Sequence, residues 1–164
     1  MFRLHCNPGL ADTPDTACIE RLKLVADRTL SCHPAGGLVD VILTDDDEIR
    51  RLNGSFRGRD QATDVLSFSF VAKDGTGDTN EFVHAEDIPA GEVYISFERA
   101  GAQARDYGVP HDEELARLLV HGLLHLAGYD HQTETELCVM EQLTEGLLAV
   151  KPDLSWPTDS PKGV

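Results

Sequence analysis

The sequence predicts a single domain of the α+β class, of α/β type, in which a mixed sheet of about four strands packs with about five helices. Three observations lead to this prediction. Short segments with strand periodicity recur along the chain, and helical segments lie both between and after them. The 164 residues suffice for one buried core. We assign residues 1–150 to this domain and residues 151–164, which include three prolines, to an irregular C-terminal tail.

Four segments have the pattern of β-strands. Phe2–Cys6 alternates apolar and polar residues, which indicates a half-buried strand with His5 facing solvent. Leu38–Leu43 is apolar and β-branched at most positions, as is typical of a central strand. Val65–Phe70 alternates apolar with small polar residues, and Glu92–Phe97 forms the fourth segment.

Local signals mark the first two helices. Thr13 followed by Pro14 predicts an N-cap and a first helical residue, for a helix that continues to about Leu30. Thr44 and the three aspartates after it predict the cap of the second helix. That helix should end near Gly58, and its apolar spacing predicts three buried residues, Ile49, Leu52 and Phe56.

Three more helices are predicted towards the C-terminus. Residues 98–107 form a short alanine-rich helix stopped by Gly108, and the fourth helix follows it and contains two of the histidines discussed below. A capping box at Thr133–Glu136 opens the fifth helix, whose buried residues should be Met140, Leu143 and Leu147. Residues 72–90 are polar and predict a long flexible loop with a solvated His84.

The most informative residues are three histidines at H-x3-H-x5-H spacing. On a helix, His121 and His125 lie one turn apart on the same face, so both imidazoles can reach one ion. Gly128 can end the helix in a left-handed conformation and turn the chain back, which would bring His131 to the same ion. We predict that all three are metal ligands. Neutral imidazoles favour Zn²⁺, and three protein ligands leave a position open for water, although Ni²⁺, copper or another divalent ion remains compatible.

This spacing resembles the H-E-x-x-H-x-x-G-x-x-H signature of the metzincin proteases, in which the Glu is the general base. Gly122 stands at that position here. The resemblance therefore favours a zincin-like metal helix without the protease chemistry. A metal-dependent hydrolase of peptides or small molecules stays open as an alternative, with Gly122 against it.

The longer string His-Gly-Leu-Leu-His-Leu-Ala-Gly-Tyr-Asp-His, from His121 to His131, resembles the signature of the bacterial YbeY family of metal-dependent endoribonucleases and ribosomal RNA maturation factors. Two further stretches are similar to the family's other motifs. Leu52–Asp60 with Thr63–Phe68 matches the second motif, and Gly91–Ser96 matches the third, although the family often has Asp at the position of Glu92. The resemblance extends from about residue 38 to residue 148 and implies the same fold.

The resemblance implies a zinc-dependent endoribonuclease that is specific for single strands and acts in ribosomal RNA maturation of the small subunit and in ribosome quality control. Its implied partners are single-stranded RNA, ribosomal RNA and ribosomal proteins of the small subunit. The oligomeric state stays open.

Positive charge is scarce, since 29 acidic residues against 14 Lys and Arg give a net charge of −15. Phosphate binding must then depend on local arginines. Arg50 and Arg51 are expected to pair with the acidic residues of their own helix, Asp46, Asp47 or Glu48. Arg57 and Arg59 lie in a glycine-containing loop, where phosphate contact is the favoured interpretation.

The resemblance also assigns roles to individual residues. Arg57 matches the family's arginine and is expected to clamp the scissile phosphate, so Arg57 and His121 are assigned to catalysis. Arg59 and Asn53 are assigned to substrate binding. Preorganised paired donors of this kind typically contribute on the order of 3 kcal/mol to lowering a barrier.

The general base stays open. By the family's pattern, Asp64 and Glu92 are the candidate supporting carboxylates. Asp130 is expected either to orient a ligand histidine through its ring N–H or to cap the turn. If the 2′-hydroxyl of the substrate attacks, no activated water is needed, and the product carries a 2′,3′-cyclic phosphate.

A ribosome-assembly binding factor, with a stabilising zinc and little catalysis, is the main alternative. The acidic composition favours contacts with basic ribosomal proteins, and this role can coexist with catalysis. The four cysteines form no C-x-x-C pair and are predicted to be reduced thiols. No apolar run approaches the roughly 20 residues of a membrane span, and the N-terminus lacks a signal-peptide core, so we predict a cytoplasmic location.

Overall fold

The computed structural model describes residues 1–70 and 89–149, which form one α+β domain around a mixed four-stranded sheet. The strands are β1 (Phe2–Cys6), β2 (Val39–Thr44), β3 (Val65–Ser69) and β4 (Gly91–Ser96). Their order across the sheet is β1-β2-β4-β3. β1, β2 and β4 are parallel, whereas β3 runs antiparallel to β4 at one edge. The predicted fold class is confirmed.

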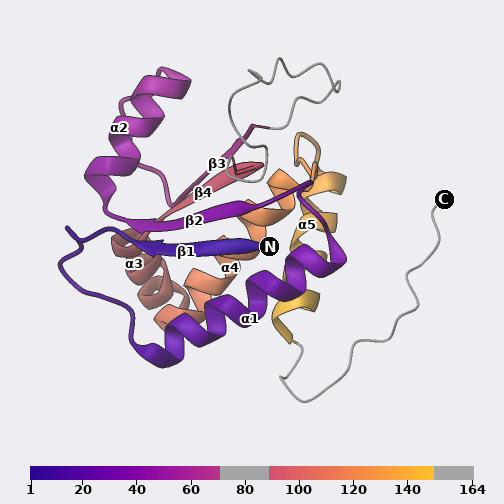
Figure 1. Cartoon of the computed structure of the whole chain (residues 1–164), viewed down its shortest axis with the longest axis horizontal. Coiled ribbons are helices and arrows are strands. Elements are labelled where there is room, and N and C mark those ends of the chain that lie inside the picture. Colours follow the sequence, from indigo (N-terminus) through magenta and orange to yellow (C-terminus); the bar gives the residue numbers. More distant parts are fainter. Residues whose placement is uncertain (71–88, 150–164) are drawn as a thin grey trace.

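Five helices surround this sheet within the described residues (Figure 1). They are α1 (Thr16–Cys32), α2 (Asp46–Arg57), α3 (Phe97–Tyr107), α4 (His111–Leu126) and α5 (Glu134–Ala149). In Figure 1, α1, α3, α4 and α5 lie on one side of the sheet, and α2 lies on the other. No helix of the described chain is long and apolar enough to cross a membrane.

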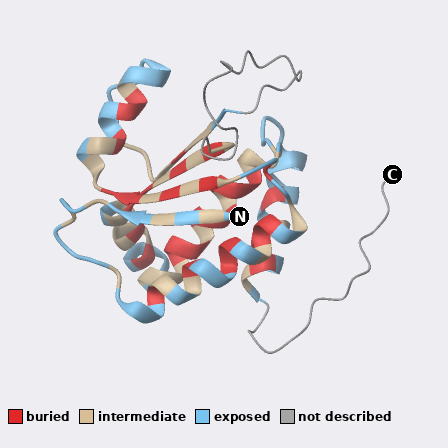
Figure 2. Ribbon diagram, viewed as in Figure 1, coloured by how far each residue is buried: buried red, intermediate tan, exposed pale blue. Residues whose placement is uncertain are grey.

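α4 is the central helix of the main core. It packs against β3 and β4 on one side and against α1, α3 and α5 on the others. Its side chains at Leu115, Leu119 and Leu123 are at most 1% exposed, and Figure 2 shows the buried residues concentrated on α4 and the central strands. Burial of this extent holds α4 firmly, because each such leucine contributes roughly 1.5–3 kcal/mol of transfer free energy. The histidines on its last two turns are therefore held by a rigid element.

A smaller core lies on the opposite face of the sheet, where α2 packs. Ile49 and Leu52 contact Leu66, and the half-buried Phe68 and Tyr94 pack against this cluster. Side chains alternate between the faces of a strand, so strand residues that point towards α2 point away from α4. This alternation decides which of the predicted site residues can meet the histidines.

The prediction that Phe56 is buried is wrong. Its side chain is 68% exposed, while Ile49 and Leu52 on the same helical face are buried as expected. The last turn of α2 extends past the sheet, as its exposed end in Figure 2 shows, so no element of the described residues covers the outer side of Phe56.

The predicted start of the first helix also needs correction. Thr13 and Pro14 precede the helix, and the N-cap is Asp15, whose carboxylate accepts a hydrogen bond from the Cys18 N–H at 2.7 Å. At α2 the cap is Asp45, which accepts from the Glu48 N–H, whereas Thr44 is the buried last residue of β2.

Other predictions of local structure are confirmed. Thr133 and Glu136 form the capping box of α5, with Thr133 N–H donating to the Glu136 carboxylate and Glu136 N–H donating to the Thr133 hydroxyl. All four cysteines are free thiols, namely Cys6, Cys18, Cys32 and Cys138. The predicted loop at 72–90, apart from its last two residues, and the predicted tail at 151–164 lie outside the described residues, as does His84.

Candidate metal centre

Two of the three predicted ligands lie on consecutive turns of α4. His121 and His125 are partly buried at the flank of the helix, and their Nε2 atoms are 3.1 Å apart. Residues four apart on a helix lie on one face, and the buried leucines orient that face towards a cleft and not into the core. The helix thus brings two ring nitrogens together without any loop.

The third predicted ligand is brought in by the turn that ends α4. Gly128 has a φ of 96°, the left-handed conformation that glycine adopts without strain. The Gly128 N–H donates to the His125 carbonyl, and the Tyr129 N–H donates to the Leu124 carbonyl. The predicted glycine turn is therefore present, and it returns His131 to a ring-centroid distance of 5.0 Å from His125.

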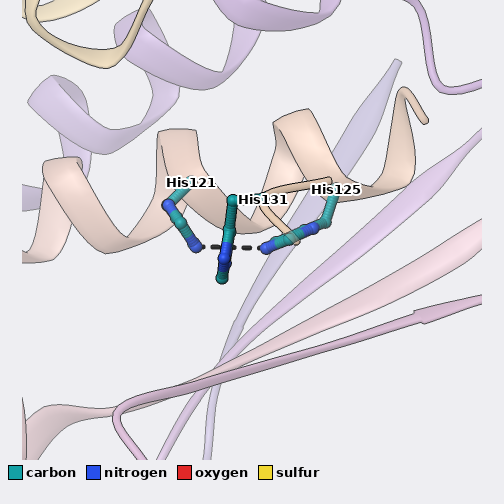
Figure 3. A group of neighbouring side chains, drawn as sticks. All are labelled: His121, His125 and His131. Carbon is teal, nitrogen blue, oxygen red and sulfur yellow. Dashed lines mark hydrogen bonds between the residues drawn. The ribbon is translucent and has the colours of Figure 1, made fainter. Parts of the chain in front are cut away.

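The three rings form a cluster whose donor atoms fit one metal ion. One ring nitrogen from each of His121, His125 and His131 lies within 4.8 Å of the other two. Figure 3 shows the rings converging, with His131 between the two helical histidines. Ligand nitrogens at about 2 Å from a common ion would lie at separations of this order, and an all-imidazole set suits Zn²⁺ and other late divalent ions.

Burial keeps two of these rings neutral, as ligation requires. Burial first, and then the neighbouring His125 and His131, lower the pKa of His121 from 6.5 to about 4. Burial is also the main cause that lowers the pKa of His125. Neutral imidazoles present lone pairs at neutral pH, so no proton must be displaced when a metal binds.

Gly122 has a packing role beside the predicted ligands. A Cβ at this position would lie 2.5 Å from Val93 Cγ1 and 3.1 Å from Ser67 Oγ. α4 therefore lies so close to β3 and β4 that only glycine fits, and the Ser67 hydroxyl donates to the Gly122 carbonyl at 3.1 Å. The position that holds a general base in the metzincin signature points here into the sheet, where a carboxylate would have no room.

A cleft of about 960 Å³ opens in front of the histidines. Its walls come from the end of α4 with the turn after it, and from β3 with the segment leading into it. Arg57, at the end of α2, reaches this cleft together with Asp64, Ser67 and Ser69. The cleft therefore combines three imidazoles, a guanidinium and small polar groups.

Arg57 differs from the two arginines nearest to it on α2. Arg50 forms a paired contact with Asp60, at 2.6 and 2.9 Å, and Arg51 forms one with Glu48, at 2.8 and 2.6 Å. The predicted pairing is thus correct for Arg51, whereas Arg50 pairs with Asp60. Arg57 has no carboxylate partner within the described chain, so its donors are free for an anion in the cleft.

Asp64 borders the same cleft and is held in a fixed orientation. One carboxylate oxygen accepts from the Val65 N–H at 2.8 Å, and the other accepts from the Gln103 side-chain amide at 3.0 Å. Gln103 lies on α3, so the orientation of this carboxylate depends on two elements. The negative charge of Asp64 raises the pKa of His121, opposing the larger effect of burial.

The remaining predicted site residues lie elsewhere or serve the backbone. Asn53 is 5% exposed, and its amide donates to the Gln61 carbonyl at 2.7 Å, which fixes the loop after α2. Arg59 is exposed but does not line the histidine cleft. Asp130 caps the turn, one of its two expected roles, by accepting from the His131 N–H at 2.8 Å.

Glu92 is not brought to the histidines. It pairs across the sheet with Phe68, and its carboxylate accepts from the Tyr94 hydroxyl at 2.9 Å. Phe68 and Tyr94 face α2, on the opposite side of the sheet from Val93, which contacts α4. A structural tie to Tyr94 is therefore the role that the geometry gives to Glu92.

Sequence reasoning missed His33 and Tyr129. The Tyr129 hydroxyl lies 3.1 Å from His33 Nδ1, and the two rings meet edge to face at 5.3 Å. The Tyr129 carbonyl meanwhile lies 3.0 Å from His125 Nδ1. Only the position of Tyr129 between Gly128 and His131 could have indicated that it contacts the histidine site. No local pattern in the sequence indicates its pairing with His33.

Fold and cleft together define an α+β protein with a three-histidine site able to hold a metal ion. The model of the family described as endoribonuclease YbeY matches residues 15–150. The chain is 42% identical over 134 residues to the endoribonuclease YbeY of Symbiobacterium thermophilum, covering 79% of this chain and 84% of the relative. It is 38% identical over 151 residues to that of Roseiflexus castenholzii, covering 87% and 89%. The chain belongs to the endoribonuclease YbeY family, a family of nucleases.

A solved structure also resembles this chain. The solution structure of a protein from Thermotoga maritima superposes with a TM-score of 0.55 at 28% sequence identity, covering 90% of this chain and 89% of the other. The similarity in fold thus extends over nearly the whole length of both chains.

Proposed function

We propose that this chain is a metal-dependent endoribonuclease that cleaves single-stranded RNA in the histidine cleft. One observation carries the proposal: Arg57, which has no carboxylate partner in the described chain, lies on the wall of the cleft that holds three convergent imidazoles. A guanidinium beside a cation site is the arrangement that a phosphodiester anion requires.

His121, His125 and His131 would hold the ion, and zinc is the metal that we propose. A bound Zn²⁺ supplies Lewis acidity, which polarises a phosphoryl oxygen and lowers the pKa of a water molecule towards roughly 7. The protein's part is to keep the rings neutral and converging. Burial does the first, and α4 with the Gly128 turn does the second.

Arg57 would bind the non-bridging oxygens of the scissile phosphate. Its paired N–H donors match two phosphate oxygens, and their positive charge opposes the negative charge that grows in the transition state. A donor of this kind contributes about 3 kcal/mol to lowering a barrier when it is preorganised. Gly58, the left-handed cap of α2, ends the helix directly after Arg57 and so fixes where the side chain leaves it.

Two routes of attack suit the residues of the cleft. In the first, Asp64 acts as a base towards a water molecule, and Gln103 and the Val65 N–H hold its carboxylate in place. In the second, the 2′-hydroxyl of the RNA attacks the adjacent phosphate and leaves a 2′,3′-cyclic phosphate. The product end distinguishes the two routes.

We further propose that the substrate is ribosomal RNA of the small subunit, within ribosome maturation and quality control in the cytoplasm. The net charge of −15 supports an additional contact with basic ribosomal proteins, since an acidic surface attracts them. Binding to RNA through phosphates should weaken steeply with salt, whereas protein contacts that bury apolar surface should weaken less.

The test uses an end-labelled single-stranded RNA and protein stripped of metal, before and after zinc is restored. Arg57→Ala is the variant that should lose activity, by about 100-fold or more if the donor contributes about 3 kcal/mol. Arg105→Ala is the matched control, because Arg105 is likewise exposed without a carboxylate partner in the described chain but lies at the end of α3. Equal activity of the two variants would contradict the phosphate clamp.

The second candidate function is a ribosome-assembly binding factor with little catalysis, which the acidic surface favours. Under that function the zinc-loaded chain would hold its metal tightly yet cleave no RNA above background. It would still bind small-subunit proteins, and its thermal stability would fall when the metal is removed.

A further inference from the structure

The end of α2 carries an aromatic surface that the proposed chemistry does not use. Phe56 is 68% exposed, and its ring leans on Phe68, with centroids 5.0 Å apart and planes tilted by 55°. Phe68 in turn meets Tyr94 edge to face at 6.0 Å. The three rings form a row from the sheet outward, which we call the aromatic row, defined by Phe56, Phe68 and Tyr94.

The aromatic row supports Phe56 from one side. Tyr94 is fixed by its hydrogen bond to Glu92, and Phe68 pairs with Glu92 in the register of β3 and β4. Phe56 is therefore propped in one orientation while most of its surface faces solvent. Exposing an aromatic ring has a free-energy cost, so a propped and uncovered ring suggests a ligand that completes the stack.

The aromatic row adjoins the phosphate clamp. Phe56 directly precedes Arg57, which lines the histidine cleft. β3, whose two sides face the cleft and α2, is an edge strand of the sheet. Ser67 and Ser69 line the cleft on one face of β3, whereas Phe68 lies on the α2 side. A nucleotide strand with a phosphate on Arg57 would thus have an aromatic ring within reach of a neighbouring base.

We infer that Phe56 is a stacking platform for a nucleobase next to the scissile phosphate. This inference rests on the proposed function and deepens it. Only an unpaired base can turn away from its neighbouring bases and stack on a side chain. The platform would make the preference for single strands a consequence of binding geometry. The nearby charges agree: Arg50 and Arg51 are paired with carboxylates, whereas Arg57 and Arg59 have no carboxylate partner in the described chain and can meet phosphates.

Three variants of the zinc-loaded full chain test this. Phe56→Leu keeps an apolar side chain but removes the ring, Phe56→Trp keeps a stacking surface, and Tyr107→Leu is the matched control. Tyr107 is 66% exposed at the end of α3, before the start of α4, whereas His121 and His125 lie on the last two turns of α4 and His131 follows that helix. Thermal unfolding of each variant establishes that it is folded.

The probe is a 2′-O-methyl RNA of about twelve nucleotides that carries a single 2-aminopurine, placed in turn at successive positions. Stacking of 2-aminopurine on a ring quenches its fluorescence, and anisotropy of an end label gives the affinity. We expect Phe56→Leu to weaken binding about 5- to 30-fold and to remove the quench at one position. Phe56→Trp should retain both within about twofold, and Tyr107→Leu should match the wild type.

Unchanged affinity and quench in Phe56→Leu would overturn the inference and leave Phe56 for a protein contact. Equal losses in Phe56→Leu and Phe56→Trp would also overturn it, because the tryptophan can stack. Cleavage of unmodified RNA separates this inference from the proposed function. If the wild type cleaves RNA and Phe56→Leu has no effect on binding or quenching, only the stacking platform is excluded. If a position-specific quench is seen but no RNA is cleaved, the nuclease function is excluded and the platform stands.

Discussion

The Nδ1 atom of His125 lies 3.0 Å from the carbonyl oxygen of Tyr129. A carbonyl oxygen can only accept a hydrogen bond, so Nδ1 carries the ring proton and Nε2 keeps its lone pair. That lone pair faces His121, at an Nε2–Nε2 distance of 3.1 Å. The backbone of the turn after α4 thus sets the tautomer of one proposed ligand, and the same turn carries His131. Two of the three proposed ligands depend on how firmly this turn is held.

The tie between Tyr129 and His33 should therefore tune metal affinity. Tyr129→Phe removes the hydroxyl that lies 3.1 Å from His33 Nδ1, while the ring stays in place. A hydrogen bond of this kind contributes about 1 kcal/mol, so we expect zinc affinity to fall about fivefold. Competition with a chromophoric chelator measures it. Tyr107→Phe removes an exposed hydroxyl at the end of α3 and should leave the affinity unchanged; a fivefold loss there too would contradict the assignment.

Alanine substitutions at Gly122 and Gly146 should change the stability of the protein in opposite directions. Gly122→Ala places a Cβ 2.5 Å from Val93 Cγ1, so α4 must move off the sheet, and we expect the free energy of unfolding to fall by about 1–3 kcal/mol. Gly146→Ala meets no atom within 4 Å on α5 and should raise it by about 0.5–1 kcal/mol, since alanine favours helices.

Urea unfolding of the two alanine variants measures both changes. Equal effects of the two substitutions would show that helix propensity and not packing governs Gly122. The same contact bears on catalysis. Gly122→Glu should lower the yield of folded protein, and it should not create a protease.

These contacts also mark how far the sequence alone could lead. The spacing of His121 and His125 and the glycine after them are local features. They predict the histidine cluster because helix geometry and a left-handed turn are nearly independent of the rest of the chain. The caps of α2 and α5 are local in the same sense. By contrast, helical periodicity placed Phe56 in the core, because the pattern says which face of α2 is apolar but not where the sheet beneath it ends.

Glu92 illustrates a second limit. Strand alternation predicts that Glu92 and Val93 point to opposite faces, but it does not say which face carries α4. That choice depends on the order β1-β2-β4-β3 and on the close approach of Gly122 to Val93, neither of which is encoded locally. The pairing of His33 with Tyr129, 96 positions apart, is non-local for the same reason.

The pKa of His121 predicts how the metal-free protein responds to acid. Burial first, and then His125 and His131, lower this pKa from 6.5 to about 4. Above pH 6.5 the ring is neutral whether the chain is folded or unfolded. Between 6.5 and about 4 the unfolded chain binds a proton that the folded chain does not, so the free energy of unfolding should decrease as the pH falls through this window.

Urea unfolding of the metal-free wild type and of His121→Gln across this window measures the effect of His121 alone. The lowered pKa values of His33 and His125 act in the same direction in both proteins. The stability of the wild type should therefore fall more steeply with acid than that of the variant. Parallel curves would mean that His121 titrates alike in the folded and unfolded chain.

Substitutions of the two motif carboxylates, Asp64 and Glu92, should differ in their effect on RNA cleavage. Asp64 lines the cleft of the histidines, and its orientation is fixed by Gln103 and the Val65 N–H. Glu92 lies on the α2 side of the sheet and is bonded to Tyr94. We expect Asp64→Asn to lower kcat for RNA cleavage by 10²-fold or more, in the range of general-base removal, while Glu92→Gln keeps kcat within about threefold.

Gln103→Leu extends this comparison, because it leaves Asp64 in place but removes the amide that donates to it at 3.0 Å. If Asp64 acts as a base, loss of this donor should leave the carboxylate poorly oriented and lower kcat for RNA cleavage, though by less than Asp64→Asn does. A merely structural Asp64 would lower stability in both variants without lowering kcat. Should the 2′-hydroxyl attack without help from Asp64, Asp64→Asn would retain wild-type kcat and the products would still end in cyclic phosphate.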